Sequence, residues 1–331
     1  DAKAGYTHYG DPKGDPELID AVCRAWEEDF GQRLPRGHVL VSASSCLGMA
    51  LVMLAILDPG DEVIVFSPYF PMYREQIELA GGVCVDVPTY ASEDYAIDEA
   101  RLRAAITPRT KAIVFNNPTN PTGMGYDGKT LELLARVAQE HDLLIAADEI
   151  YTTYLYEGDF RPIRTLPGMA ERTITLNSFS KNFLMTGWRV GVIIAEPELL
   201  AVMNRINGSL IYSAPSVSQR AALQALAMRK EIREKYVTAY RDRIFYAADR
   251  IEKIPYLSLV RPKGTFYLFP GVEKTGLDEK AFCKVLLDQA HVLVSPGTPF
   301  GVSAAGHFRI ACTVGIDQLK TAFDRMEKLS F

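Results

Sequence analysis

The sequence predicts an α/β fold in which helices cover a mainly parallel central sheet, followed by a smaller C-terminal α+β domain. Short β-rich apolar runs alternate with helical stretches from residue 15 to about residue 207, as in parallel strands joined by crossover helices. Most of these runs are continuously apolar, which suits strands that are covered on both faces. From about 213 to 253 the sequence is strongly helical, and two further strand-like segments follow at 257–270 and 291–301.

The first predicted helix has recognisable start and stop signals. Asp15 can cap its N-terminus with Pro16 in the first turn, and Gly31 ends it. One face of this helix carries Leu18, Ile19, Val22, Trp26 and Phe30. The longest apolar run, LGMALVMLAIL at 47–57, is too short to cross a bilayer, which takes about 20 residues. We interpret this run as a buried helix.

Seven runs are predicted as strands of the large sheet: 38–41, 62–66, 83–87, 111–115, 143–147, 173–177 and 190–195. Helical stretches lie between them, so that most neighbouring strands should run parallel. We expect a large domain over residues 1–230 and a small C-terminal domain over residues 231–331.

The composition excludes several classes of protein. The chain has 331 residues, 48% of them hydrophobic and 23% charged, and a net charge of −5, which argues against a nucleic-acid-binding surface. Its five cysteines are an odd number without a CxxC pair, which favours a reducing compartment over a disulfide framework or a zinc site. The histidines are scattered without ligand spacing, so we expect no metal. No signal-like segment opens the chain, and we expect a cytoplasmic protein without a membrane span.

Polar and aromatic residues follow the ends of five predicted strands. These segments are SASSC after 38–41, SPYF after 62–66, NNPTNPTG after 111–115, DEIY after 143–147, and SFSK after 173–177. In open sheets of this kind ligands bind at the carboxyl ends of the strands. The sequence therefore predicts a binding site at one edge of the sheet.

One end of this predicted site suits a phosphate group. Ser44, Ser45 and Cys46 open the predicted helix at 45–57, where free backbone N–H groups favour an anion. Ser178 and Arg189 can add side-chain donors.

The other predicted site residues suit an aromatic aldehyde. Asp148 can keep a ring nitrogen protonated, Asn120 and Tyr151 can contact a ring hydroxyl, and Phe70 can stack on the ring, although Tyr69 is an alternative. Lys181, which taken alone could be an ordinary surface lysine, can form an imine with the aldehyde. A phosphate, a ring nitrogen, a hydroxyl and an aldehyde are together the features of pyridoxal 5′-phosphate (PLP).

Five motifs in order resemble those of fold-type I PLP enzymes of the class I/II aminotransferase family, the aspartate and aromatic aminotransferases. The motifs are YGDPKG, NNPTNPTG, DEIY, SFSKNFLMTGWRVG and HFRIACT, and the likeness runs from Tyr9 to the C-terminus. The resemblance implies a three-layer PLP-transferase fold. It also implies that Arg309 grips the substrate carboxylate and that the peptide bond between Asn120 and Pro121 is cis. Tyr9, for which nearby Tyr6 is an alternative, would reach the phosphate of the neighbouring subunit in a homodimer with shared active sites.

The activity implied is transamination between an L-amino acid and a 2-oxo acid. Lys181 would hold the cofactor and then act as general base, with Asp148 and Tyr151 as its catalytic partners. Asn120 and Arg309 would bind the substrate, the latter through a bidentate pair. Alternatives on the same scaffold are carbon–sulfur β-elimination, a cyclopropane-forming synthase and, more distantly, the PLP-binding domain of a transcriptional regulator.

The sequence departs from the family pattern in two places. The family usually has a glycine and a small residue at Ser44 and Ser45, and often a hydroxyl or an amine at Cys46, so we expect slightly altered phosphate contacts. The chain also begins just before the YGDPKG motif, and we expect that an N-terminal arm present in family members is missing.

Overall fold

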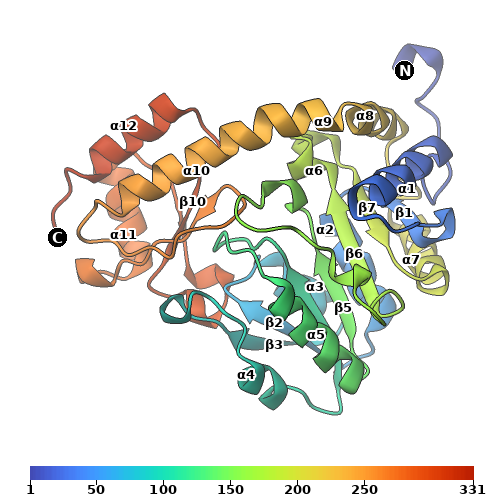
Figure 1. Cartoon of the computed structure of the whole chain (residues 1–331), viewed down its shortest axis with the longest axis horizontal. Helices are drawn as coiled ribbons and strands as arrows, with labels where there is room; N and C mark the ends of the chain where they lie inside the picture. The colour runs from blue at the N-terminus through green and yellow to red at the C-terminus, as the bar shows by residue number, and fades with distance from the viewer.

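The computed structural model describes residues 1–331 and contains two sheets (Figure 1). The large sheet has seven strands in the order β1-β7-β6-β5-β4-β2-β3. Its strands are β1 (Val39–Ser42), β2 (Glu62–Ser67), β3 (Val83–Pro88), β4 (Thr110–Asn116), β5 (Leu144–Asp148), β6 (Thr173–Ser178) and β7 (Gly191–Ile194). These strands lie within one or two residues of the seven predicted runs.

The prediction of a mainly parallel sheet is confirmed, with β7 as the exception. Strands β3, β2, β4, β5 and β6 pair in parallel, whereas β7 runs antiparallel to both β6 and β1. Between β6 and β7 the chain forms only the one-turn helix α6 (Phe179–Asn182) and a short 3-10 turn. A parallel neighbour needs a crossover, usually an α-helix, that carries the chain back along the full length of the sheet. This link holds only one helical turn and a 3-10 turn, so the next strand runs in the opposite direction.

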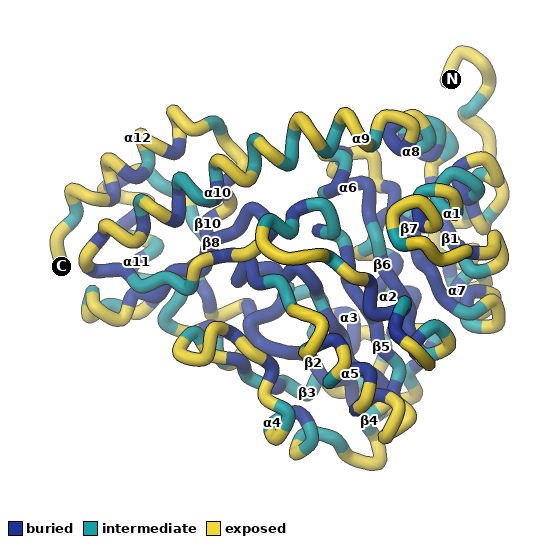
Figure 2. Tube along the Cα trace, viewed as in Figure 1, coloured by how far each residue is buried: buried dark blue, intermediate teal, exposed yellow.

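Helices cover both faces of the large sheet in three layers (Figure 1). The helices of the large domain are α1 (Pro16–Phe30), α2 (Ser45–Ile56), α3 (Met72–Leu79), α4 (Glu99–Ala104), α5 (Gly128–Glu140) and α7 (Pro197–Leu210). Along β2, Val63 and Val65 pack with α2, α3 and α7, whereas Ile64 and Phe66 pack with α4 and α5 on the other face. Because side chains alternate across a strand, a run that is buried throughout needs helices on both sides. Figure 2 shows the central strands mostly buried beneath these helices, whereas the edge strand β3 is largely only half-buried.

Helix α1 begins and ends where the sequence predicts. The carboxylate of Asp15 accepts a hydrogen bond from Glu17 N at 2.9 Å. Gly31 ends the helix with a left-handed backbone at φ 69°. Helix α2, the predicted buried helix, contributes Leu51, Val52 and Met53 to the core, each fully buried.

The C-terminal part of the chain contains a three-stranded sheet in the order β8-β10-β9. Its elements are α8 (Ser216–Ala227), α9 (Arg229–Ile232), a π-helical turn (Arg233–Val237), α10 (Thr238–Ile251), β8 (Tyr267–Leu268), α11 (Glu279–Val285), β9 (Ser295–Pro296), β10 (Phe308–Ala311) and α12 (Ile316–Met326). The strands are shorter than the predicted segments 257–270 and 291–301, since proline and glycine interrupt both segments and proline cannot donate to a ladder. The predicted domain boundary at 230 falls within the helices α8 to α10 and stays a prediction.

The carboxyl ends of the parallel strands meet at one edge of the large sheet. Asp148 at the end of β5 pairs in register with Asn116 at the end of β4 and with Leu176 of β6. The peptide bond between Asn120 and Pro121 is cis, which confirms that expectation. None of the helices combines the length and the apolar character that a membrane crossing requires.

Candidate active site

A cavity of about 320 Å³ opens at this edge of the sheet. Of the predicted site residues, the following line it: Ser44, Ser45, Cys46, Phe70, Asn120, Asp148, Tyr151, Lys181, Arg189 and Arg309. They come from segments that lie far apart in the chain, after β1, β2, β4, β5 and β6 and on β10. Ser178 and Tyr9 are not part of the lining.

One end of the cavity is the start of α2. Ser44 caps this helix, its hydroxyl accepting a hydrogen bond from Leu47 N at 3.2 Å. The chain here approaches β7 so closely that a Cβ on Gly191 would lie 2.5 Å from the backbone of Ser44 and Ser45. The N-terminus of a 12-residue helix carries unpaired N–H groups that favour an anion.

Ser44 holds a backbone conformation that normally requires glycine. Its φ is 109° and its ψ is 157°, a region that costs a residue with a Cβ on the order of 1–3 kcal/mol. The surrounding structure enforces it, since Ser42 Oγ donates to the Ser44 carbonyl at 2.8 Å. Ser44 is thus held in a strained backbone conformation at the start of α2.

Cys46 and Arg189 complete this end of the cavity. Burial raises the pKa of the Cys46 thiol, with the Arg189 charge opposing the shift, so the sulfur stays protonated and uncharged near neutral pH. Arg189 is exposed, and its Nη1 donates to the Thr186 carbonyl at 2.8 Å. A neutral thiol and a guanidinium together suit a phosphate.

Asp148 is a buried carboxylate with one oxygen in use. Tyr73 OH donates to its Oδ2 at 2.5 Å, whereas Oδ1 is buried without a hydrogen-bond partner. Burial raises the pKa of Asp148 to about 6, although the hydrogen bond from Tyr73, the Ile150 N–H and the Lys181 charge all favour the ionised form. A buried acceptor without a partner is rare in folded proteins, and a protonated ring nitrogen would complete it.

Glu149, the next residue, is buried on the other side of the strand. Its Oε1 accepts a hydrogen bond from Ile163 N at 3.1 Å. Burial, with a further contribution from Asp148, raises the pKa of Glu149 to about 8. Glu149 is therefore mostly protonated at neutral pH and leaves Asp148 as the acid that faces the cavity.

Lys181 projects from the one-turn helix α6 into the cavity. Its Nζ lies 5.9 Å from the ring centroid of Phe266. Burial, with Arg309 as the next cause, lowers the pKa of the Lys181 amine. A lowered pKa increases the fraction of neutral amine, which is the nucleophilic and basic form.

Arg309 lies at the far end of the cavity from α2. Its Nη1 donates to Asn120 Oδ1 at 2.8 Å, and its guanidinium lies over the rings of Tyr267 at 4.7 Å and Phe300 at 4.9 Å. Arg309 Nε is buried without a partner. The aromatic contacts and the bond to Asn120 hold the planar fork in place for a carboxylate.

Phe70 and Tyr69, the two candidates for stacking on the cofactor ring, differ in position. Phe70 is half-buried and lines the cavity, whereas Tyr69 is 4% exposed and its hydroxyl accepts from Arg74 Nε at 3.0 Å. Tyr9 is 86% exposed and meets Tyr212 edge-to-face at 5.1 Å. The ring-stacking role of Phe70 and the intersubunit role of Tyr9 stay predictions.

Ser178 caps α6 and faces away from this cavity. Its hydroxyl accepts from Ser180 N at 3.1 Å and contacts the Val190 carbonyl at 3.3 Å. It lines a second cavity on the other side of α6. Its predicted contact with a phosphate stays a prediction.

Sequence reasoning missed two tyrosines of the site. Tyr73 bonds Asp148, and Tyr267 lies 3.2 Å from Tyr151, hydroxyl to hydroxyl. Tyr73 lies in the first turn of α3, three residues after Phe70, and the two rings meet edge-to-face at 5.7 Å. The position of Tyr267 depends on how the C-terminal part of the chain packs, and no local pattern indicates it.

The fold and this cavity define a PLP-transferase architecture, and comparison with known proteins identifies the family. The family model for "Aminotransferase class I and II" matches residues 1–326. The chain belongs to this family, and it is an enzyme that catalyses transamination between an amino acid and a 2-oxo acid.

Several relatives match over nearly the whole chain. The aspartate/prephenate aminotransferase of Thermus thermophilus is 38% identical over 98% of this chain and 84% of its own length. The aromatic-amino-acid aminotransferase 2 of Thermococcus litoralis is 35% identical with the same coverage. The solved structure of an aromatic aminotransferase from Pyrococcus horikoshii has a TM-score of 0.96 and 34% identity, and the match covers 99% of this chain and 88% of that chain.

Replacing Ser44 with glycine should relieve the backbone strain at this position and stabilise the folded protein. We expect Ser44→Gly to raise the free energy of unfolding by about 1 kcal/mol, since glycine relieves the positive φ and the lost cap costs only a few tenths of that. Urea denaturation of the cofactor-free protein measures the change. The matched control is Ser45→Gly, in the first turn of α2, which should destabilise by about 0.5–1 kcal/mol. Equal destabilisation in both variants would contradict the assigned strain.

The buried Glu149 makes stability depend on pH. Because the pKa of Glu149 is raised to about 8 in the folded protein, the folded state holds a proton that the unfolded state releases near its ordinary pKa. Stability from this group is therefore present at low pH and lost as the pH rises toward 8, by at most about 1.4 kcal/mol per pH unit.

We expect Glu149→Gln to flatten that loss between pH 6 and pH 8, a window above the pKa of about 6 of Asp148. The difference in free energy of unfolding between variant and parent, from urea titrations, should grow with pH in favour of glutamine. A difference that stays constant across this window would exclude a buried, protonated Glu149.

Proposed function

We propose that this aminotransferase binds pyridoxal 5′-phosphate in the cavity at the carboxyl ends of the parallel strands. The observation that carries the proposal is the meeting of Lys181, Asp148 and Arg309 in one cavity, where the last two each present a buried polar atom without a partner. When bound, PLP supplies an aldehyde that takes up the amino group and a ring that accepts electrons from the α-carbon.

Each end of the cofactor has a matching group in this chain. The N–H groups at the start of α2, the Cys46 thiol and Arg189 would hold the phosphate. Asp148 Oδ1 would accept the ring N–H and keep that proton on the ring, because a carboxylate at this depth is stabilised by a neighbouring positive charge. Tyr151 would contact the ring hydroxyl and Phe70 the ring face.

Lys181 would hold the cofactor and later carry the α-proton. Its lowered pKa, caused by burial and by Arg309, increases the fraction of neutral amine, the form that can accept a proton from the substrate carbon and return it nearby. Buried Asp148 favours the charged lysine and so opposes part of this shift in the pKa of the amine.

The substrate would bind by its carboxylate to Arg309. Asn120 holds one arm of the guanidinium, and Nε and the remaining N–H groups can take both carboxylate oxygens. The substrates proposed are therefore L-amino acids and the matching 2-oxo acids.

We also propose that two copies of the chain form a homodimer that shares its active sites. Exposed apolar side chains support this, because large contiguous apolar patches mark interaction surfaces. Tyr9 packs on Tyr212 outside the core, with Leu210 and Ile211 beside it in sequence, and Trp188 is exposed next to Arg189. For the location we propose the cytoplasm, which the five free cysteines support.

The proposed dimer can be tested by the mass of the protein in solution and by the dependence of PLP affinity on Tyr9. We expect sedimentation equilibrium of the PLP-loaded protein to give twice the 36.7 kDa of one chain. Tyr9→Phe should keep that mass and weaken PLP binding about tenfold, as for a lost hydrogen bond to a charged group. A monomer with full PLP affinity would contradict the shared site.

Lys181 and Arg309 test the proposed function directly. We expect Lys181→Ala to lower the turnover of an amino acid and 2-oxo acid pair by at least about 10³-fold, because the base is lost. Arg309→Ala should instead raise KM by about 10–100-fold, since a charge-assisted pair is lost. The measurement combines the visible absorbance of the PLP-loaded protein with release of the 2-oxo acid across a panel of amino acids.

Two controls accompany these variants. Far-UV circular dichroism should show both folded, and Arg309→Lys should recover only part of the loss, because an ammonium cannot make the bidentate pair. Near-normal turnover in Lys181→Ala would refute the assignment, whereas pyruvate and sulfide from cysteine-like substrates would indicate a lyase.

A further inference from the structure

The position of Lys181 depends on contacts outside the cavity. Lys181 lies on α6, which is only the four residues Phe179–Asn182. A single helical turn has almost no stability of its own, because nucleation fixes several residues for one hydrogen bond. Side chains next to Lys181 must therefore supply the restraint.

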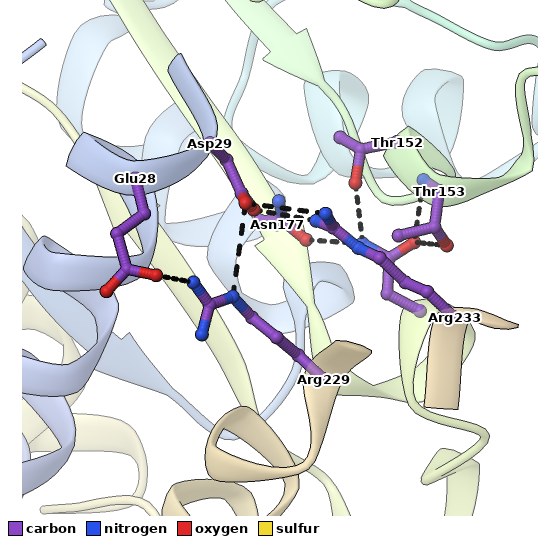
Figure 3. A network of polar contacts seen from close by, with 8 residues as sticks. Glu28, Asp29, Thr152, Thr153, Asn177, Arg229 and Arg233 are labelled. Atoms are coloured by element: carbon purple, nitrogen blue, oxygen red, sulfur yellow. Dashed lines mark hydrogen bonds and ion pairs between the residues drawn. The ribbon is translucent and has the colours of Figure 1, made fainter. Parts of the chain in front are cut away.

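Asn182, the residue after Lys181, lies on the far side of α6. Its side chain is 7% exposed and lines the second cavity, of about 80 Å³. Nδ2 donates to Thr152 Oγ1 at 2.9 Å and to Asn177 Oδ1 at 3.2 Å, and Oδ1 accepts from Thr153 Oγ1 at 3.0 Å. Figure 3 labels these three partners around the network. Both N–H donors and the carbonyl of the amide are thus in use.

These bonds connect α6 to the turn that follows Tyr151. Thr152 and Thr153 belong to the 3-10 turn Thr152–Tyr154, which begins directly after Tyr151. Tyr154 OH also donates to the Lys181 carbonyl, at 3.0 Å. The turn that carries Lys181 and the turn that follows Tyr151 are therefore joined on the side away from the cofactor cavity.

The charged groups across the second cavity are occupied with one another. Arg233 Nη2 pairs with Asp29 Oδ2 at 2.6 Å, and Arg229 pairs with Glu28 (Figure 3). They make no hydrogen bond to Asn182, whose partners are all uncharged. The amide network is separate from these ion pairs and can be changed without breaking them.

We propose that Asn182 is a positioning residue that fixes Lys181 relative to Tyr151, and that its function requires a complete amide. Aspartate would keep the acceptor for Thr153 but lose both donors and set a negative charge against Asn177 Oδ1. Alanine would lose all three bonds. Because small displacements of a reacting group can slow a reaction by about 10²-fold, the lysine amine would reach the cofactor aldehyde less often in either variant.

The inference rests on the proposed function, and two forms of the cofactor separate the effects. Pyridoxamine 5′-phosphate has an amine in place of the aldehyde and cannot react with Lys181, so its affinity, from calorimetry, reports only the shape of the cavity. Attachment of PLP to Lys181 is measured by borohydride trapping at timed intervals, with mass spectrometry to locate the modified residue.

We expect Asn182→Ala and Asn182→Asp to slow attachment of PLP to Lys181 by about tenfold or more, within the range for misplaced groups. The affinity of both variants for pyridoxamine 5′-phosphate should stay within about twofold of the parent's affinity, because the cavity keeps its shape. Asp29→Asn is the matched control on the opposite wall of the same cavity, and it should leave the attachment rate unchanged.

A second pair of variants guards against misfolding of the Asn182 variants. Thr153→Val removes one bond to the amide and should slow attachment by about threefold, whereas Thr153→Ser keeps the hydroxyl and the parental rate, consistent with about 1 kcal/mol for one hydrogen bond. Unchanged attachment in Thr153→Val and Asn182→Ala would overturn the proposal. A parallel fall in pyridoxamine phosphate affinity would also overturn it, in favour of a purely structural role. Failure of the parent protein to attach PLP would refute the proposed function itself, and this inference with it.

Discussion

The direction of the central strands is the constraint on which the site depends. From β3 to β6 the strands are parallel, so that their carboxyl ends and the loops after them meet at one edge. That edge receives Asn120 after β4, Asp148 on β5 and Lys181 after β6. Antiparallel β7 begins at the same edge, so that Gly191, its first residue, and the preceding Arg189 lie there, with Gly191 close against the start of α2. Asp148 lies on a strand that is buried on both faces, and Asn120 and Lys181 follow such strands within four residues, which explains how residues far apart in the chain keep fixed distances.

Burial sets the electrostatics of this edge. Asp148 and Glu149 are adjacent, yet one faces the cavity and the other faces the core, because successive side chains of a strand point to opposite sides. Burial raises the pKa of both, but Asp148 has Tyr73 and the nearby Lys181 charge to favour its ionised form. Two neighbouring carboxyl groups therefore differ in charge at neutral pH, and the single negative charge lies where a cofactor ring nitrogen would need it.

The backbone around the cavity is strained at Ser44 and restrained at α6 by contacts between several residues. Ser44 keeps a backbone conformation suited to glycine, because Ser42, Leu47 and the close approach of Gly191 leave it no alternative. On the opposite side of α6, the Asn182 amide joins the lysine turn to the turn after Tyr151. Both features act by fixing backbone position at the cavity and need no contact with the reacting atoms.

The sequence by itself determined the class of fold, the seven strands within one or two residues, and the limits of α1, because these follow from local apolar runs, caps and glycine stops. It also indicated most of the residues that line the cavity, since polar segments at the ends of parallel strands must meet. Only the tertiary structure decided that β7 is antiparallel, that Tyr73 bonds Asp148, that Tyr267 reaches Tyr151, and that Ser178 faces away from the cavity. These features depend on which segments and side chains from distant parts of the chain come together and, for Ser178, on the direction of its hydroxyl group. A pattern of period 2 or 3.6 along the chain carries no information about either.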